Sequence, residues 1–378
     1  IESYDEGIPI IAQIGSAGCV DSETEFMSQD GWKKISEYSD GDKVMQVSQS
    51  GLEATFVDPL AYIKKPCEWF YSIETDRGIN QWLSPDHNIA YTVKNKTRLN
   101  KKNIEDVLEM HESSGLGFNG RVPTVYDYSD GFSLNLSEDM IRLGVALKAD
   151  GHINNENSMQ YSIRLKKERK IERLMSLLDS LNYEYTSRYQ ESTGYTIFSL
   201  YADWCSKSLS DWMLCAKEDA QIIMDEYRHW DGRFNSTGSR ESDFSTVIKE
   251  EADAMQYFGN ICGFRSTIGV TDRTGEQYKN NSDYTRQSIE YTVCFSNQTH
   301  IGLLPYNRGE QKKTEPTKKY AKDGYKYCFT VPSGFLLLRR NNSVFITGNS
   351  GKTFVALHRA LTDVFDPQTP YTQVMIVR

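Results

Sequence analysis

The sequence predicts a mainly β domain that is interrupted by an α+β domain with an internal duplication. Two observations predict the β domain. Short runs in residues 44–95 alternate apolar and polar side chains between turns, and residues 325–347 repeat this pattern. Such alternation is typical of strands that bury one face. Between these two segments the apolar residues recur at helical spacing, which predicts the inserted α+β domain.

In the inserted part, a pair of segments with helical periodicity is followed by a second, similar pair at a nearly constant distance along the sequence. Helices are expected over residues 140–149, 168–181, 222–230 and 252–261. The first and third are each followed by Asp-Gly, and Asp231 follows Asp150 by 81 positions (231 − 150). We therefore predict two similar halves, each with a helix, a hairpin and a packing helix, related by a pseudo-twofold axis.

The predicted organisation has five segments along the chain, which has enough residues for two or three domains. In order they are a flanking segment, the first part of the β domain, the inserted domain, the second part of the β domain and another flanking segment: residues 1–18, 19–136, 137–305, 306–349 and 350–378.

The composition is that of an ordinary soluble protein, with 38% hydrophobic and 25% charged residues. Neither a long apolar run nor a basic-then-apolar leader is present, so no membrane span and no signal peptide are predicted. The seven cysteines lack paired spacing, which favours reduced thiols in the cytoplasm. The net charge of −9 disfavours non-specific DNA binding as the main function.

The two flanking segments carry the halves of a phosphate-binding loop. An apolar run at 8–15 leads into Gly15-Ser-Ala-Gly18, and Ser-Gly351-Lys352-Thr353 opens an amphipathic helix. Joined, they read Gly-Ser-Ala-Gly-Ser-Gly-Lys-Thr between a strand and a helix, which fits G-x-x-x-x-G-K-S/T. The alternative is a chance match between two glycine-rich loops.

A joined loop would bind ATP with Mg²⁺. Backbone N–H groups would surround the phosphates, Lys352 would neutralise them and Thr353 would hold the metal ion. With residues 19–349 between the halves the loop is broken, so nucleotide binding is expected only after the halves are joined. The joined flanks resemble the start of a PhoH-like P-loop ATPase. A competing hypothesis is an ATPase with a long insertion.

The ends of the interrupting segment carry groups suited to excising it. The thiol of Cys19 can attack the carbonyl of Gly18, which converts the amide into a thioester. The hydroxyl of Ser350 can then accept the acyl group, and Asn349 can cyclise onto its own carbonyl and release the segment. Folding would make these nucleophilic steps intramolecular. They require no cofactor, and their substrates are the chain's own flanking segments.

Residues 19–349 resemble the intein family, whose members excise themselves from a host protein. The blocks that carry the resemblance are Cys19-Val-Asp-Ser-Glu-Thr-Glu-Phe, Asp30-Gly-Trp-Lys-Lys-Ile, Ser84-Pro-Asp-His87, Tyr327-Cys-Phe-Thr-Val and Val344-Phe-Ile-Thr-Gly-Asn-Ser. The resemblance implies a horseshoe-shaped β domain in which both seams meet. It also implies that His87 polarises and protonates the first scissile amide, with Ser84 in place of the usual threonine.

Two positions differ from the pattern of that family. Gly348 stands where histidine commonly precedes the terminal asparagine, and Cys328 stands where many members have aspartate. Arg339 and Arg340 are candidates to replace the histidine, with a structural role as the alternative. Cys328 could tune or relay the acyl group, or it could be a buried core cysteine.

The inserted domain resembles LAGLIDADG homing endonucleases. Leu143-Gly-Val-Ala-Leu-Lys-Ala-Asp-Gly matches the first signature helix, whereas the second candidate matches only at Asp231-Gly. The resemblance implies that Asp150 and Asp231 share Mg²⁺ and cut double-stranded DNA of the uninterrupted host gene. Glu226 and Trp230 are large for a close helix contact. The alternative is a decayed endonuclease that persists as a passenger domain.

Overall fold

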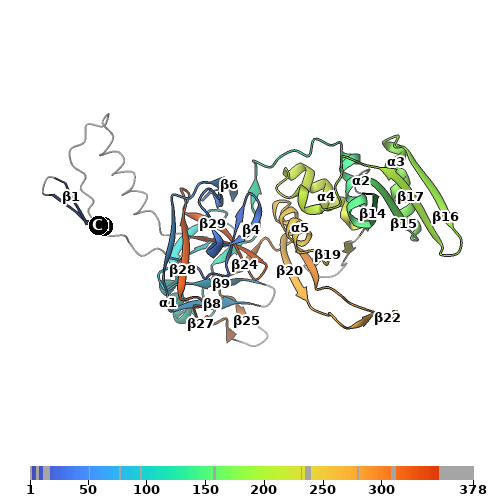
Figure 1. The fold of residues 1–378 in the computed structure, drawn as a ribbon. Coiled ribbons are helices and arrows are strands. Elements are labelled where there is room, and N and C mark those ends of the chain that lie inside the picture. Colours follow the sequence, from blue (N-terminus) through green and yellow to red (C-terminus); the bar gives the residue numbers. More distant parts are fainter. Residues whose placement is uncertain are drawn as a thin grey trace.

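The computed structural model describes residues 2–5, 8–11, 18–50, 52–75, 78–93, 96–155, 159–230, 232–234, 240–278, 281–307 and 312–348. Strand residues outnumber helical residues in this part of the chain, so the fold is mainly β (Figure 1). A hairpin of β1 (Glu2–Asp5) and β2 (Ile8–Ile11) precedes the larger domains. Within the described ranges, every helix is too short or too polar to cross a membrane.

The β domain is assembled from both ends of the chain. Its elements are β3 (Glu25–Ser28), β4 (Gly31–Lys34), the 3-10 helix η1 (Ile35–Glu37), β5 (Val44–Val47), β6 (Glu53–Val57), β7 (Ala61–Pro66), β8 (Trp69–Glu74), β9 (Asn80–Leu83), β10 (Asn88–Tyr91), β11 (Asn100–Asn103), α1 (Ile104–Ser113), β12 (Arg121–Pro123), β13 (Asp127–Tyr128), β24 (His300–Gly302), β25 (Tyr306–Asn307), β26 (Lys312–Lys313), β27 (Thr317–Tyr320), β28 (Tyr325–Thr330), β29 (Phe335–Arg340) and β30 (Ser343–Gly348).

Late strands pair with early ones throughout this domain. β29 pairs with β3 and β5, β28 pairs with β7, and β27 pairs with β8, all antiparallel. Phe26, Phe329 and Phe345, which lie far apart in the sequence, meet in one core. Because these side chains are fully buried, the two ends of the β domain hold each other in place.

The inserted domain is built from two halves with the same order of elements. The first contains α2 (Glu138–Asp150), β14 (Gly151–Asn155), β15 (Gln160–Leu165), α3 (Glu168–Ser180), β16 (Tyr185–Gln190), β17 (Tyr195–Tyr201) and the 3-10 helix η2 (Leu209–Trp212). The second contains α4 (Lys217–Trp230), β18 (Gly232–Phe234), β19 (Arg240–Thr246), α5 (Lys249–Ile261), β20 (Arg265–Thr271), β21 (Gln277–Tyr278), β22 (Asn281–Thr285) and β23 (Glu290–Ser296).

The strand order confirms the predicted duplication. One sheet runs β14-β15-β17-β16, and the corresponding strands of the second half run β18-β19-β23-β20. The first helices of the two halves, α2 and α4, pack against each other. All four predicted helices are present, although α4 begins five residues before the predicted 222–230 segment. The region around residues 325–347 forms three strands rather than the two that the alternation predicted.

The large residues at the α2–α4 contact are accommodated by an ion cluster. Glu226 is fully buried and accepts hydrogen bonds from Arg142 (3.1 Å), Arg173 (3.0 Å) and the indole of Trp230 (3.0 Å). A buried carboxylate is tolerated when its charge is neutralised and its oxygens are bonded. Glu226 and Trp230 therefore belong to the packing of this contact.

A single sheet continues from the β domain into the inserted domain. Its order is β13-β6-β5-β29-β30-β20-β23-β19-β18, and the step between domains is the pair Thr267–Ser343. Beside this step, Arg339 donates two hydrogen bonds of 2.7 Å to Glu25 and a further one to Asp253 of α5. Arg339 is fully buried, so this ion cluster ties the two domains together.

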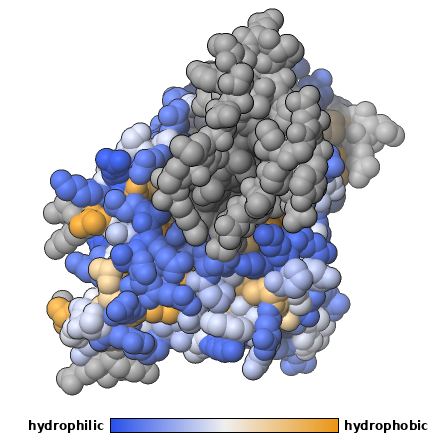
Figure 2. Space-filling model, turned by 90° about the vertical axis from the view of Figure 1, so that its left-hand side faces the viewer, coloured by the Kyte–Doolittle hydropathy of each residue, from blue (hydrophilic) through white to orange (hydrophobic). Residues whose placement is uncertain are grey.

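The described surface seen in Figure 2 is mostly hydrophilic, as the composition leads one to expect. Figure 2 shows a face whose described part is mostly hydrophilic, with apolar residues scattered singly rather than gathered into one patch. Scattered apolar residues are ordinary on soluble proteins.

Candidate functional site

Cys19 is fixed at the centre of the β domain by backbone pairing on both sides. Val20 exchanges hydrogen bonds of 2.8 and 2.9 Å with Tyr327 of β28, and it also forms a bridge to Leu83 at the end of β9. The Cys19 side chain is fully buried as a result. The first residue of the predicted excised segment therefore lies inside the protein, between strands from opposite ends of the chain.

The peptide nitrogen of Cys19 is held by the motif at residues 84–87. Its N–H donates to Ser84 Oγ at 2.9 Å, and the Ser84 N–H donates back to the Cys19 carbonyl at 3.0 Å. Ser84 Oγ in turn donates to Asp86 at 2.6 Å. This chain of hydrogen bonds orients the amide whose nitrogen must leave when a sulfur attacks the Gly18 carbonyl. The hydroxyl of Ser84 thus lies where the sequence predicted it.

Asp86 and Lys326 form an ion pair that the sequence interpretation did not assign to the site. Lys326 Nζ lies 2.9 and 2.7 Å from the two Asp86 oxygens. Burial acts to raise the pKa of Asp86, but the hydrogen bonds from Lys326 and Ser84 hold it below its ordinary value. Asp86 therefore stays ionised and anchors Ser84. Asp86 could have been identified as a site residue because it lies inside the 84–87 motif. No feature of the sequence indicates that Lys326 pairs with Asp86.

We expect Lys326→Met to lower the free energy of unfolding by about 1–3 kcal/mol at pH 7, because Asp86 loses a charged hydrogen-bond donor. The folded state lowers the pKa of Asp86, so this contribution is present above the unfolded pKa and is lost as the pH falls through the folded value. The difference should therefore vanish in acid. Urea unfolding of chains that also carry Cys19→Ala and Asn349→Ala measures it. Lys322→Met, an exposed control, should change little.

Cys328 lies against Cys19 in a small buried cluster with Ile63. Hydrogen bonding to Cys19 and burial both raise the pKa of Cys328 well above the ordinary value for a thiol. Cys328 is therefore a neutral thiol at pH 7, and its S–H donates to the carbonyl oxygen of Phe329 at 3.4 Å. This arrangement fits a tuning role for Cys328, which the sequence left open beside a purely structural role.

His87 lies between the first seam and the last described strand before the second seam. Its Nε2 lies 2.6 Å from Oγ1 of Thr347, which belongs to β30. Burial lowers the pKa of His87 to about 4, although the nearby carboxylate of Asp86 acts in the opposite direction. The imidazole is thus neutral at pH 7, with one nitrogen able to donate and the other able to accept a proton.

Two glycines approach the same stretch of backbone from opposite ends of the chain. A Cβ on Gly18 would lie 2.3 Å from the Cα of His87, and a Cβ on Gly348 would lie 2.6 Å from the carbonyl oxygen of Asn88. Real Cβ atoms do not come so close, so both positions require the absence of a side chain. Gly18 and Gly348, from opposite ends of the predicted insert, therefore both lie against the backbone of residues 87–88.

Arg339 and Arg340 have structural roles. Arg339 is bonded to Glu25 and Asp253, and Arg340 makes a pair of hydrogen bonds of 2.9 and 3.0 Å with Asp21. Both guanidinium groups are committed to carboxylates on other strands or helices. Of the two alternatives from the sequence, these contacts support the structural one.

Several predicted residues lie outside the described part of the chain. These are Gly15, Asp231, Asn349, Ser350, Gly351, Lys352 and Thr353. The phosphate loop, the second endonuclease aspartate and the chemistry of the second seam therefore remain predictions. Gly18, Cys19, Ser84, His87, Cys328 and Gly348 are described, and they gather in one place.

The first predicted endonuclease residue is engaged by a cation. Asp150, at the end of α2, forms an ion pair with Lys170 of α3. A divalent ion would have to displace this ammonium group, so the described residues do not fit a Mg²⁺ site here. Among the residues with described positions, no cluster of three or more acidic, histidine or cysteine side chains could hold a metal ion.

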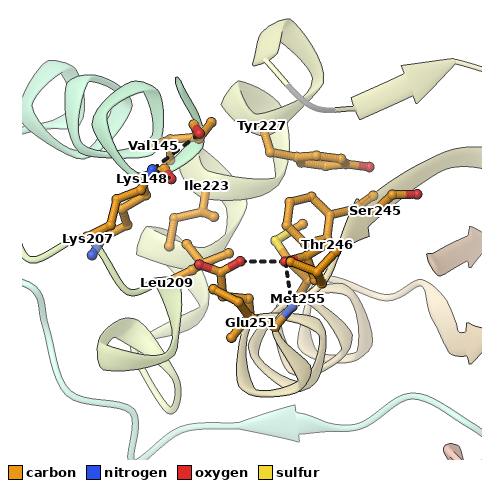
Figure 3. Close-up of a pocket in the computed structure, with 14 residues that line it drawn as sticks. Val145, Lys148, Lys207, Leu209, Ile223, Tyr227, Ser245, Thr246, Glu251 and Met255 are labelled. Carbon is orange, nitrogen blue, oxygen red and sulfur yellow. Dashed lines mark hydrogen bonds between the residues drawn. The ribbon is translucent and has the colours of Figure 1, made fainter. Parts of the chain in front are cut away.

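A pocket of about 300 Å³ lies between α2, α4, α5 and β19 (Figure 3). Its walls are mostly apolar and include Ile223, Tyr227 and Met255. The two lysines at its edge, Lys148 and Lys207, donate to backbone carbonyls at the end of α2 and in the segment that follows β17. These lysines hold the end of the helix in place, and Glu251 in the same lining accepts a hydrogen bond of 2.6 Å from Thr246.

Comparison with known proteins finds distant likenesses only. No family model matches the chain, and no curated protein matches it. Solved structures similar to parts of it include a splice-inactive variant of the AceL NrdHF class 3 split intein, with 17% identity and a TM-score of 0.24, covering 28% of this chain and 63% of that one. The match thus spans less than two thirds of that intein.

Two further similar structures each match 42% of this chain. Mesophilic variants of the homing endonuclease I-DmoI have 17% identity and a TM-score of 0.30, with 42% of this chain and 88% of that chain covered. The N-terminal LAGLIDADG domain of DUF199/WhiA has 12% identity and a TM-score of 0.29, with 42% and 79% covered. Likenesses this distant carry no weight in assigning a function.

Proposed function

We propose that the chain is a self-splicing intein that excises residues 19–349 and joins Gly18 to Ser350. The observation that supports this most strongly is the position of His87 between the first seam and the strand that leads toward the second. Its backbone lies against Gly18, and its Nε2 lies 2.6 Å from Oγ1 of Thr347, two residues before Asn349. Breaking and remaking two peptide bonds in one chain requires this proximity, since it converts a reaction between distant groups into an intramolecular one.

The first step is an exchange at Gly18–Cys19. The sulfur of Cys19 attacks the Gly18 carbonyl carbon, a C–S bond forms and the C–N bond breaks. The thiol proton ends on the nitrogen of Cys19, which becomes an amine. Ser84 orients this nitrogen, and the neutral imidazole of His87 can pass a proton to it. The neutral thiol of Cys328 packs against the attacking sulfur.

The later steps use the second seam. The hydroxyl of Ser350 attacks the thioester, which gives an ester and returns the thiol of Cys19. The side-chain nitrogen of Asn349 then attacks its own carbonyl carbon and breaks the bond to Ser350, so the excised segment ends in a succinimide. The freed amine of Ser350 displaces its ester oxygen, and an ordinary peptide bond joins the flanks. We propose that the flanks then form the P-loop of a PhoH-like ATPase.

Expression of the full chain followed by intact-mass measurement tests this proposal. We expect two products, the excised segment 19–349 and a ligated peptide of residues 1–18 and 350–378. Cys19→Ala should abolish ligation, because no thioester can form. Asn349→Ala should stop after ester formation and leave a branched chain or a released N-terminal segment. A wild-type chain that persists at full length would contradict the proposal.

A further inference from the structure

The hydroxyl of Thr347 reaches the imidazole of His87 from the opposite end of the predicted insert. Its Oγ1 lies 2.6 Å from Nε2 of His87, and both side chains are buried. Thr347 is placed by the β29–β30 pair, in which it lies opposite Leu336. His87 is placed by the turn that follows β9, where its N–H donates to the carbonyl of Ser84 at 2.9 Å. Two separate parts of the fold therefore set this contact.

The direction of this hydrogen bond follows from the partners that each atom has. In the described part of the chain, Thr347 Oγ1 bonds to His87 alone, and Nδ1 of His87 has no hydrogen-bond partner. If Nε2 donated to Oγ1, both the hydroxyl hydrogen and Nδ1 would be left unbonded in the interior. If the hydroxyl donates to Nε2, Nδ1 alone is left. Because each buried polar group without a partner is costly, the hydroxyl is the donor.

A hydrogen bond in this direction fixes the tautomer of His87. A neutral imidazole carries one proton, so a nitrogen that accepts a hydrogen bond leaves that proton on the other nitrogen. Burial lowers the pKa of His87 to about 4, which keeps the ring neutral at pH 7. The proton of the ring is therefore on Nδ1.

The two ring nitrogens lie toward different parts of the site. Nε2, at the far end of the ring, contacts β30. Nδ1 is the nitrogen closer to the residue's own backbone, and Gly18 lies against that backbone, since a Cβ on Gly18 would be 2.3 Å from the Cα of His87. The nitrogen of Cys19 must take up a proton when its bond to Gly18 breaks. A proton on Nδ1 is thus the one that the first step needs.

We propose that Thr347 is a positioning residue for the first step: its hydroxyl holds His87 in the tautomer with the proton on Nδ1, from which the amine of Cys19 receives it. The thiol proton of Cys19 replaces this proton on the imidazole, so the ring is neutral again at the end of the step. This proposal rests on the proposed splicing function. Because β30 follows every other described strand of the β domain in the sequence, the tautomer is set only after both ends of the domain have paired.

The test compares Thr347→Val with Thr347→Ser. Valine keeps the branched shape and removes the hydroxyl, whereas serine keeps the hydroxyl and removes the methyl group. Thr330→Val is the matched control, because Thr330 is another buried threonine of the β domain and its Oγ1 has no hydrogen-bond partner among the described residues. The rate of thiol-induced release of residues 1–18 is measured for each full chain.

We expect Thr347→Val to slow this release by about 10–10², a smaller loss than removal of the imidazole itself, because the ring stays in place while its proton is no longer held on the required nitrogen. Thr347→Ser should recover most of the wild-type rate, and Thr330→Val should release residues 1–18 as the wild type does. Release at the wild-type rate in Thr347→Val would overturn the inference. An equal loss in Thr347→Val and Thr347→Ser would also overturn it, since packing alone would then explain the effect.

Nitrogen NMR of the imidazole measures the tautomer independently of splicing. The spectrum is recorded on the full chain with Cys19→Ala and Asn349→Ala, and an additional His87→Gln substitution identifies the signals of His87. We expect the proton on Nδ1 in this chain, and at least part of it on Nε2 when Thr347→Val is added. A proton on Nε2 with Thr347 in place would overturn the inference. A wild-type chain that has the expected tautomer but fails to splice would instead overturn the proposed function.

Discussion

Replacement of His87 with alanine is expected to slow splicing by about 10²–10⁴, the usual loss when a general acid–base group is removed. The first seam should be affected most, because the amine of Cys19 must receive a proton as its bond to Gly18 breaks. Burial lowers the pKa of His87 to about 4, so the wild-type imidazole is neutral at pH 7 and can act as both acceptor and donor. The rate of thiol-induced release of residues 1–18 measures the effect.

The control for this prediction is His152→Ala. His152 is an exposed residue of β14 in the inserted domain, so its loss should leave the rate unchanged. His87→Gln is a useful second variant, because it keeps a hydrogen-bonding group beside Thr347 but cannot carry a proton between partners. Splicing of His87→Ala at the wild-type rate would show that the contact with both seams is structural only.

Replacement of Arg339 with alanine is expected to lower the free energy of unfolding by about 3–5 kcal/mol, the usual cost of removing one partner from a buried ion pair. Glu25 and Asp253 would each lose a charged donor, and Trp32 would lose the guanidinium group 4.5 Å from its ring centre. Urea unfolding of chains that carry Cys19→Ala and Asn349→Ala measures the change. Because Arg339 joins two domains, the transition should also become less cooperative.

Arg188→Ala is the matched control for Arg339→Ala. Arg188 is an exposed residue of β16, and its removal should change the free energy of unfolding by less than about 0.5 kcal/mol. A loss below 1 kcal/mol in Arg339→Ala would mean that water or neighbouring groups replace the guanidinium, and that this cluster does not hold the domains together.

Local patterns in the sequence were sufficient for some features and not for others. Helical periodicity identified α2 to α5 within a few residues, since amphipathic spacing is a property of neighbours along the chain. The 84–87 motif likewise placed Ser84 and His87 at the first seam. The partners of these residues could not be predicted, because Lys326 lies 240 positions from Asp86 and Thr347 lies 260 positions from His87.

The surroundings of Gly348 illustrate a different obstacle. In the sequence Lys101 is one lysine in a polar run, and its neighbours Asn100 and Lys102 are polar as well. Only the pairing of β10 with β11, combined with that of β29 with β30, brings it beside Gly348. Gly348 could be singled out in the sequence because histidine is common at this position. The residue that lies beside it depends on the register of two separate hairpins.

The sheet that passes from β30 to β20 bears on how such a protein could lose its insert in evolution. A deletion of the inserted domain would remove the strand that pairs with Ser343 at the start of β30. It would also remove Asp253 from Arg339, which would keep its two hydrogen bonds to Glu25. A shorter descendant would therefore lose two contacts at once, and we expect compensating substitutions beside Ser343 and Arg339.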